Sequence, residues 1–189
     1  MDDRFRYPAY LVRKKILKLF GGEFRVYDPL GNLVFLSKQK AFKLREDIRL
    51  YTDESMSREV LAVNARQILD FSAAYDVFDS GTKTKVGALK RRGFKSLVRD
   101  EWIVMDPWDR EIGRVREDSL ALLRRFVNLI PQKFHIEVSG RPVCRIKQNF
   151  NPFTLKLHVD FGPDPAFTFD RRLGLAVAVL LCAIEGRQE

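Results

Sequence analysis

The residues in this sequence that are most clearly suited to binding chemistry are the cations of residues 81–99. This stretch holds seven basic residues and no acid, against a net charge of +9 for the whole chain. On a strand, residues two apart share a face, so Lys83 with Lys85, and Lys90 with Arg92, can each direct two cations at one polyphosphate. Arginine forks fit phosphate oxygens and lysine adds point charge. We therefore predict an anion or lipid headgroup site with these contacts: Lys83, Lys85, Lys90, Arg91, Arg92 and Lys95.

Two alternatives apply to the basic segments. Residues 81–99 also fit a solvated sheet face, with Phe94 in the core instead of in a membrane interface. A second basic cluster could form a membrane-facing amphipathic segment. For it we favour an edge strand and loop whose cations protect the end of a sheet. The cations of this second cluster are Arg13, Lys14, Lys15 and Lys18.

Enzyme chemistry has little support in the sequence. His135 and Glu137 share a strand face and could serve a metal or an acid–base pair, but no third ligand is evident, so an exposed polar pair is favoured. The chain has no Gly-x-Ser-x-Gly elbow, phosphate-binding loop or dinucleotide fingerprint. Its two cysteines, Cys144 and Cys182, show neither disulfide nor metal-ligand spacing, which favours a reducing compartment. We expect no enzyme, no cofactor and no metal.

The bulk composition indicates a protein with a large core and an anionic partner. Of the 189 residues, 46% are hydrophobic and 15 are Phe, which favours an aromatic-rich interior. A net charge of +9 favours lipid headgroups, nucleic acid or an acidic protein, although a basic surface also aids solubility alone. The N-terminus has no secretory pattern, and no stretch reaches the length of a transmembrane helix.

The element that must organise the rest is the apolar segment near the C-terminus. From residue 173 to 184 no side chain is polar, and a helix that is apolar all round must be buried all round. Charges bracket this run, and it is too short for the roughly 20 residues that cross a bilayer. We therefore predict a core helix over about residues 170–185, with the remaining chain wrapped around it. Within it, we expect Gly174 to be a close-packing point and Cys182 an inert packing residue.

The preceding chain repeats a four-strand unit. Each unit begins with a hairpin of two alternating strands around a turn that contains Gly. The three hairpins occupy residues 24–38, 75–90 and 134–147. A second pair of strands follows each hairpin, except that the third unit runs into the apolar helix before its fourth strand.

Residues 10–14 could supply that missing strand and close the sheet. About twelve strands result, more than an open twisted sheet usually carries, so we predict a mostly β protein: one closed antiparallel barrel over residues 1–189 around the buried helix. A further helix is expected over residues 118–127, where Asp118 can cap it.

This arrangement resembles the tubby C-terminal-like superfamily, in its LURP-one-related and phospholipid scramblase-like branch. The likeness lies in Tyr-Leu-Val-Arg-Lys-Lys at 10–15, in the hairpin over 79–94 with Trp102 after it, and in Val-Asp-Phe at 159–161 before the core helix. The resemblance implies a barrel whose surface cations bind phosphoinositide headgroups, as in tubby-type domains. Calcium is associated with scramblases, but Pro165 and Arg171 stand where a calcium loop requires Gly and Glu, so we do not expect specific calcium binding.

From these observations we expect a non-enzymatic module that binds anionic phospholipid, including phosphoinositide, at the cytosolic membrane face. A nucleic-acid-binding protein using the same cations is the first alternative, although the helix or stacking aromatics of common readers are missing. A scaffold whose charge is incidental is the second. Lipid transport ranks last, because no segment is expected to span a membrane.

Overall fold

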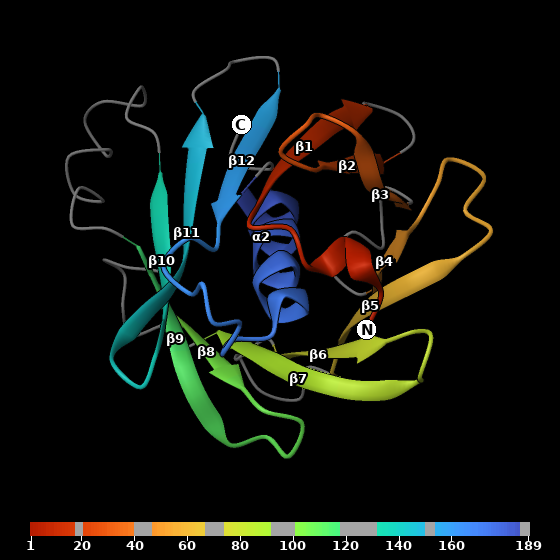
Figure 1. The fold of residues 1–189 in the computed structure, drawn as a ribbon. Coiled ribbons are helices and arrows are strands. Elements are labelled where there is room, and N and C mark those ends of the chain that lie inside the picture. The colour runs from red at the N-terminus through yellow and green to blue at the C-terminus, as the bar shows by residue number, and fades with distance from the viewer. Residues whose placement is uncertain are drawn as a thin grey trace.

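In a computed structural model, the fold is a closed β-barrel that surrounds one helix (Figure 1). The structure describes residues 1–17, 21–39, 47–66, 74–91, 101–117, 132–149 and 154–185. The elements, in chain order, are η1 (Asp3–Phe5), β1 (Ala9–Leu17), β2 (Gly21–Tyr27), β3 (Leu33–Gln39), β4 (Asp47–Tyr51), β5 (Glu59–Ala65), β6 (Ala74–Asp79), β7 (Thr84–Arg91), β8 (Trp102–Met105), β9 (Glu111–Glu117), β10 (Lys133–Val138), β11 (Arg141–Asn149), β12 (Leu155–Asp160) and α2 (Arg171–Glu185).

All twelve strands pair antiparallel with their neighbours in sequence, and β1 closes the ring against β12. The seam between these two strands is in register from Ala9, opposite Asp160, to Lys14, opposite Leu155. The predictions of a barrel of about twelve strands, and of residues 10–14 as its closing strand, are confirmed.

The edge-strand explanation of the second basic cluster is therefore wrong. Strand β1 hydrogen-bonds to β12 on one side and to β2 on the other, so it has no free edge for cations to protect. Lys14 is buried within the barrel, whereas Arg13 and Lys15 are exposed. Lys18 lies outside the described residues, as does the helix predicted over 118–127.

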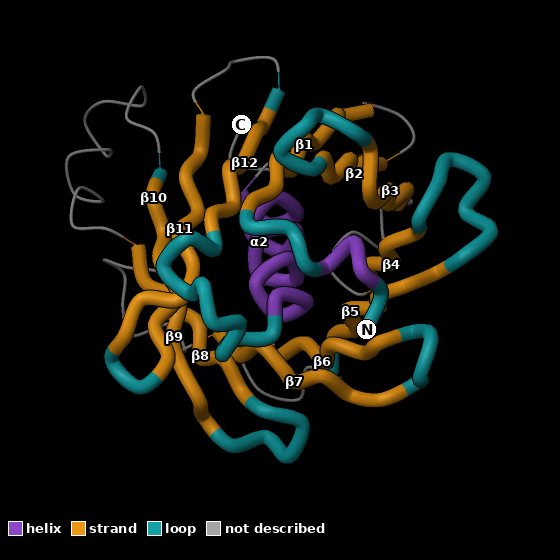
Figure 2. Tube along the Cα trace, in the orientation of Figure 1, coloured by secondary structure: helices purple, strands orange, loops and turns teal. Residues whose placement is uncertain are grey.

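The prediction of a buried apolar helix is confirmed. Helix α2 runs through the middle of the barrel, and every one of its residues from Leu173 to Ala183 is buried (Figure 2). Gly174 is a close-packing point, because a Cβ built there would lie 2.6 Å from two ring carbons of Phe161. Inward side chains of alternate strand positions complete this core, as the period of two requires.

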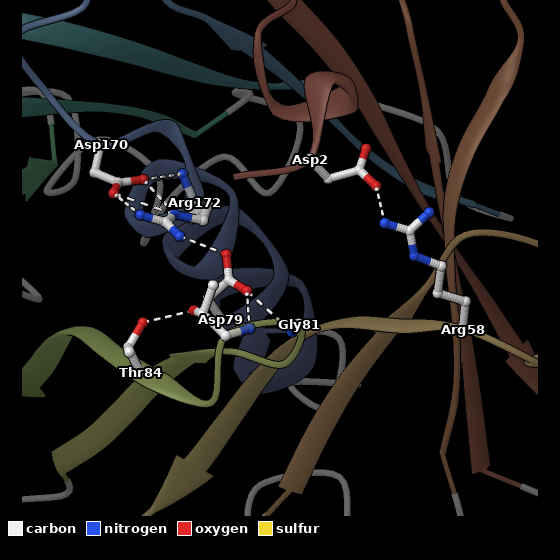
Figure 3. Close-up of polar contacts among 8 residues, drawn as sticks. Asp2, Arg58, Asp79, Gly81, Thr84, Asp170 and Arg172 are labelled. Carbon is white, nitrogen blue, oxygen red and sulfur yellow. Dashed lines mark hydrogen bonds and ion pairs between the residues drawn. The ribbon is translucent and has the colours of Figure 1, made fainter.

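Polar contacts hold both ends of the helix. At its start, Arg172 donates to Asp79 of the β6–β7 hairpin at 2.6 Å and to Asp170 at 2.5 Å (Figure 3). At its far end, the buried Lys14 ammonium donates to the Cys182 carbonyl at 2.8 Å, where a cation also complements the helix dipole. These contacts join the helix to the β6–β7 hairpin at one end and to β1 at the other.

The two ends of the barrel have different connections. At the end where α2 begins, here called the turn end, short turns join β2 to β3, β4 to β5, β6 to β7, β8 to β9 and β10 to β11 (Figure 1). The opposite end, where α2 finishes, is where the chain enters the segments outside the described residues. Among the described helices, none has the length and apolar character needed to cross a membrane.

Candidate functional site

The cations predicted from residues 81–99 are placed at both ends of β7. Lys83 is exposed in the β6–β7 turn at the turn end, whereas Lys90 and Arg91 stand at the far end of the strand. Lys85 and Lys90 are five positions apart, which is about 15 Å along a strand. The four described cations therefore do not converge on one point. Arg92, Lys95 and Phe94 lie outside the described residues.

Lys85 is already paired with carboxylates. Its ammonium lies 2.9 Å from Asp76 and 2.7 Å from Asp109 of the β8–β9 turn. Burial lowers the pKa of Lys85, but hydrogen bonds to the two carboxylates outweigh it, and the net shift is upward. This cation is charged, but its charge is largely balanced within the protein.

The same balance extends over the outer surface of β4 to β9. Arg49 pairs with Asp47 at 2.6 Å and Glu59 at 3.0 Å. Further pairs join Arg66 to Asp76 and Asp109, Arg114 to Glu101 and Glu111, and Arg116 to Glu101 and Glu137. This half of the barrel therefore presents a surface on which cations and carboxylates alternate.

The other side of the barrel differs. Strands β10, β11, β12 and β1 carry seven outward cations, and we call the five other than Lys15 and Arg141 the basic wall. Four of the five are exposed and the fifth, Lys156, is half-buried. Among the described residues, no ion pair joins any of them to a carboxylate. The basic wall consists of Arg13, Lys133, Arg145, Lys147 and Lys156.

Strand register places like charges of the basic wall directly opposite each other. Lys133 of β10 faces Lys147 of β11, and Arg13 of β1 faces Lys156 of β12. Directly opposed residues have Cβ atoms about 5 Å apart, and like charges at that spacing destabilise a sheet. Lys147 also faces His158 of β12. An anion placed over these strands would relieve the repulsion.

The same strands carry two outward carboxylates: Glu137 of β10, which pairs with Arg116, and Asp160 of β12. Asp160 stands opposite Arg145 at the turn end of β12, and its side chain accepts a hydrogen bond from the Gly162 amide at 2.8 Å. The described residues contain 24 Lys and Arg against 20 Asp and Glu, a net charge of +4. The five cations of the basic wall exceed that net charge, so the remainder of the described barrel is close to neutral.

His135 and Glu137, predicted to form an exposed polar pair, are adjacent on the outer face of β10 but half-buried, and Glu137 also pairs with Arg116. His135 Nε2 lies 3.2 Å from Glu137, whose carboxylate also lies 3.3 Å from Arg116. Over the described residues, no group of three metal-ligating side chains comes together. Cys144 and Cys182 are both buried and form no disulfide with each other, and burial raises the pKa of the Cys144 thiol well above its usual range.

The acids of the loop before α2 serve local structure. Buried Asp164 accepts hydrogen bonds from the Thr168 amide and hydroxyl and from the Phe169 amide, at 2.7–2.9 Å. Asp170 pairs with Arg172. These carboxylates therefore fix the path of the chain into the helix.

Sequence reasoning missed the basic wall because its members are far apart in the chain. Each strand shows cations at alternate positions, such as Arg145 with Lys147, but alternation alone does not tell which strands are neighbours. The predicted closure of the barrel by residues 10–14 could have indicated the basic wall, since closure places Arg13 beside the third repeat unit.

Comparison with known proteins identifies the family. The family model described as LURP-one-related matches residues 34–182. The fold is similar to that of a protein from Arabidopsis thaliana solved by X-ray crystallography, with a TM-score of 0.54 and 17% identity over 96% of this chain and 94% of that one. None of the curated proteins matches this chain. Because the family model covers well over half of the sequence, the resemblance inferred from the residues is confirmed, and the chain belongs to the LURP-one-related family.

Proposed function

We propose that this protein is a non-enzymatic module that binds anionic phospholipid, with phosphoinositide among its ligands, at the cytosolic face of a membrane. The observation that carries the proposal is the basic wall, in which five outward cations have no carboxylate partner among the described residues. Lysine and arginine near an anionic membrane surface contribute about 1 kcal/mol each. The lipid binding implied by the resemblance to tubby-type barrels agrees with this chemistry.

Two surfaces compete for the role of lipid contact. The basic wall offers five cations on four adjacent strands, whereas the β7 set offers Lys83, Lys85, Lys90, Arg91, Arg92 and Lys95. Ion pairs already balance Lys85, and the other described members of the β7 set stand at opposite ends of the strand. We therefore favour the basic wall and retain the β7 set as the rival.

Nucleic acid is the other anionic ligand that the same cations would attract. A flat array of cations binds phosphates without reading bases, so its affinity would fall steeply with salt and would need no lipid. If the chain instead served as a scaffold for another protein, it would bind neither vesicles nor nucleic acid. A lipid module should instead respond to the anionic fraction of the membrane.

The test is vesicle co-sedimentation at two salt concentrations, with neutral, phosphatidylserine-containing and polyphosphoinositide-containing vesicles. Two double variants carry the same change of charge: Lys133→Glu/Lys147→Glu in the basic wall and Lys83→Glu/Lys90→Glu in the β7 set. Loss of two membrane cations alone should lower affinity at least about thirtyfold, before any added repulsion.

We expect the wild type and the β7 variant to sediment with anionic vesicles, and the basic wall variant to stay in the supernatant. The opposite pattern would transfer the site to β7. A wild type that ignores every vesicle would refute the lipid function, and titration with single- and double-stranded nucleic acid would then test the alternative.

A further inference from the structure

The described surface has large apolar side chains that protrude from the turn end. Leu30, in the β2–β3 turn, is 85% exposed, and Trp108, in the β8–β9 turn, is 74% exposed. In the strand order of the barrel, these two turns are six strands apart and therefore stand on opposite sides of the ring (Figure 1). Leu30 stands beside the basic wall, and Trp108 stands beside the ion-paired half.

A groove lies between the β2–β3 turn and the basic wall, lined on the turn side by Pro29 and Gly31, the neighbours of Leu30. It opens on the outer side of β1 and β12 below the β2–β3 turn and encloses about 300 Å³. Arg13, a member of the basic wall, stands in it with its guanidinium 4.8 Å from the centre of the Tyr27 ring. The residues that line it include Leu11, Arg13, Tyr27, Pro29, Gly31 and His158.

The β2–β3 turn holds its shape without help from the Leu30 side chain. Buried Asp28 accepts hydrogen bonds from the amides of Leu30 and Asn32 at 2.9 Å and 2.8 Å, and from the Asn32 side chain at 3.0 Å. These hydrogen bonds, led by that of the Asn32 side chain, hold the pKa of Asp28 below its ordinary value. The carboxylate that borders the groove is thus occupied by the turn, and Leu30 is left projecting from a preorganised support.

We propose that the β2–β3 turn inserts into the surface of an anionic bilayer. Leu30 enters the interfacial layer, and the groove binds a phospholipid headgroup whose phosphate lies between Arg13 and His158. This inference rests on the proposed function and adds an orientation and a headgroup site to it. A bilayer is the occupant because one projecting leucine beside free cations offers far less than the roughly 1,200 Å² that a stable protein interface buries. Leucine with a neighbouring cation is instead the combination that peripheral segments place at a membrane surface.

The orientation makes a prediction for two positions at the same end of the barrel. With the basic wall and Leu30 against the membrane, the β8–β9 turn on the opposite side of the ring faces away from it. Leu30 should therefore meet lipid and Trp108 should remain in water. Trp102, the other tryptophan, is buried against the core and gives a constant background.

Tryptophan emission can read both positions. The wild type reports on Trp108, and Leu30→Trp in a Trp108→Phe background reports on the β2–β3 turn. Each is mixed with phosphatidylserine-containing vesicles whose acyl chains are brominated, after co-sedimentation has measured binding. We expect blue-shifted, quenched emission from Leu30→Trp/Trp108→Phe and unchanged emission from the wild type.

Two further variants test the groove by affinity. Leu30→Ser should weaken binding to the same vesicles about tenfold, the lower end of what burying a leucine yields. Arg13→Ala should weaken it about fivefold, the effect of removing one cation from an anionic membrane surface. Trp108→Ser is the matched control at the other turn and should change nothing. All three side chains are on the surface, so the far-ultraviolet circular dichroism of the variants should equal that of the wild type.

The outcomes separate this inference from the proposed function. Vesicle binding with unchanged emission at position 30, or with quenching of Trp108 instead, would overturn the orientation and leave the lipid function standing. Unchanged affinity of Leu30→Ser and Arg13→Ala would overturn the groove in the same way. Absence of vesicle binding by the wild type would refute both.

Discussion

Replacing Lys147 by Glu should stabilise the fold while it weakens membrane binding. Lys147 faces Lys133 across the β10–β11 pair, and at a charge separation of about 6 Å in water their repulsion is about 0.7 kcal/mol. Reversal of one sign converts that repulsion into an attraction of similar size. After the side-chain ordering that an exposed ion pair requires, the gain in the free energy of unfolding should be about 1 kcal/mol at low salt.

Urea unfolding of Lys147→Glu at low and at 0.15 M ionic strength measures this gain, since urea adds no salt. The Debye length of about 8 Å at the higher ionic strength should reduce the gain by about half. Lys90→Glu is the matched control, because Lys90 is exposed on β7 and its cross-strand neighbours are the uncharged Ala74 and Ile103. Its stability should change little.

A double-mutant cycle completes the test. Lys133→Glu/Lys147→Glu restores like charges across the pair, so its stability should return toward that of the wild type, with a coupling energy that shrinks in salt. That variant would also show that loss of vesicle binding is not caused by unfolding. If Lys147→Glu is no more stable than Lys90→Glu at low salt, the cations of the basic wall do not repel one another and the argument for an anion between them fails.

Three further predictions concern the core. Gly174→Ala should lower the free energy of unfolding by about 1 kcal/mol, because overpacking against Phe161 exceeds the gain in helix propensity of about 1 kcal/mol; a more stable variant by urea titration would refute the packing argument. Ala178→Asp should abolish cooperative unfolding, followed by circular dichroism, since the carboxylate would have no partner in the barrel, whereas Ala178→Gly should unfold cooperatively. Burial raises the pKa of Asp79, but hydrogen bonds from the Thr82 amide and Arg172 lower it by more, so the net shift is downward. The contribution of Asp79 to the free energy of unfolding is therefore present above the unfolded pKa near 4 and is lost as the pH falls through the lower folded pKa. Asp79→Asn should flatten the dependence of stability on pH below about pH 4, and an unchanged slope would contradict this.

The core was predictable because its signals are local. The apolar run that forms α2 is too short to cross a bilayer, so it must be a helix buried inside the protein. The period of two in each hairpin marks the inward positions without knowledge of the partner strand. Gly174 could be interpreted in the same way, since a glycine inside a helix costs stability and implies a close neighbour. What could not be read was the identity of that neighbour, Phe161, which lies beyond β12.

The candidate site was less predictable, because the sequence does not show which cations are paired with carboxylates or buried in the folded protein. Residues 81–99 contain no acid, yet Lys85 is balanced by Asp76 from the adjacent strand and Asp109 from the next hairpin. Lys14 looks like its neighbours in the sequence but is directed inward by strand alternation and donates to the helix. Only strand register tells a paired cation from a free one.

The basic wall depends on closure of the barrel, and this ties binding to folding. Arg13 comes from the first strand and Lys156 from the last, so their opposition exists only when β1 completes the ring. Buried Arg171 at the start of α2 supports this closure, because its guanidinium donates to the carbonyls of Arg6 and Tyr7, in the segment that leads into β1. The core helix thus holds in place the strand that contributes to both the wall and the groove, and a change that loosens the seam should weaken anion binding without touching a single wall residue.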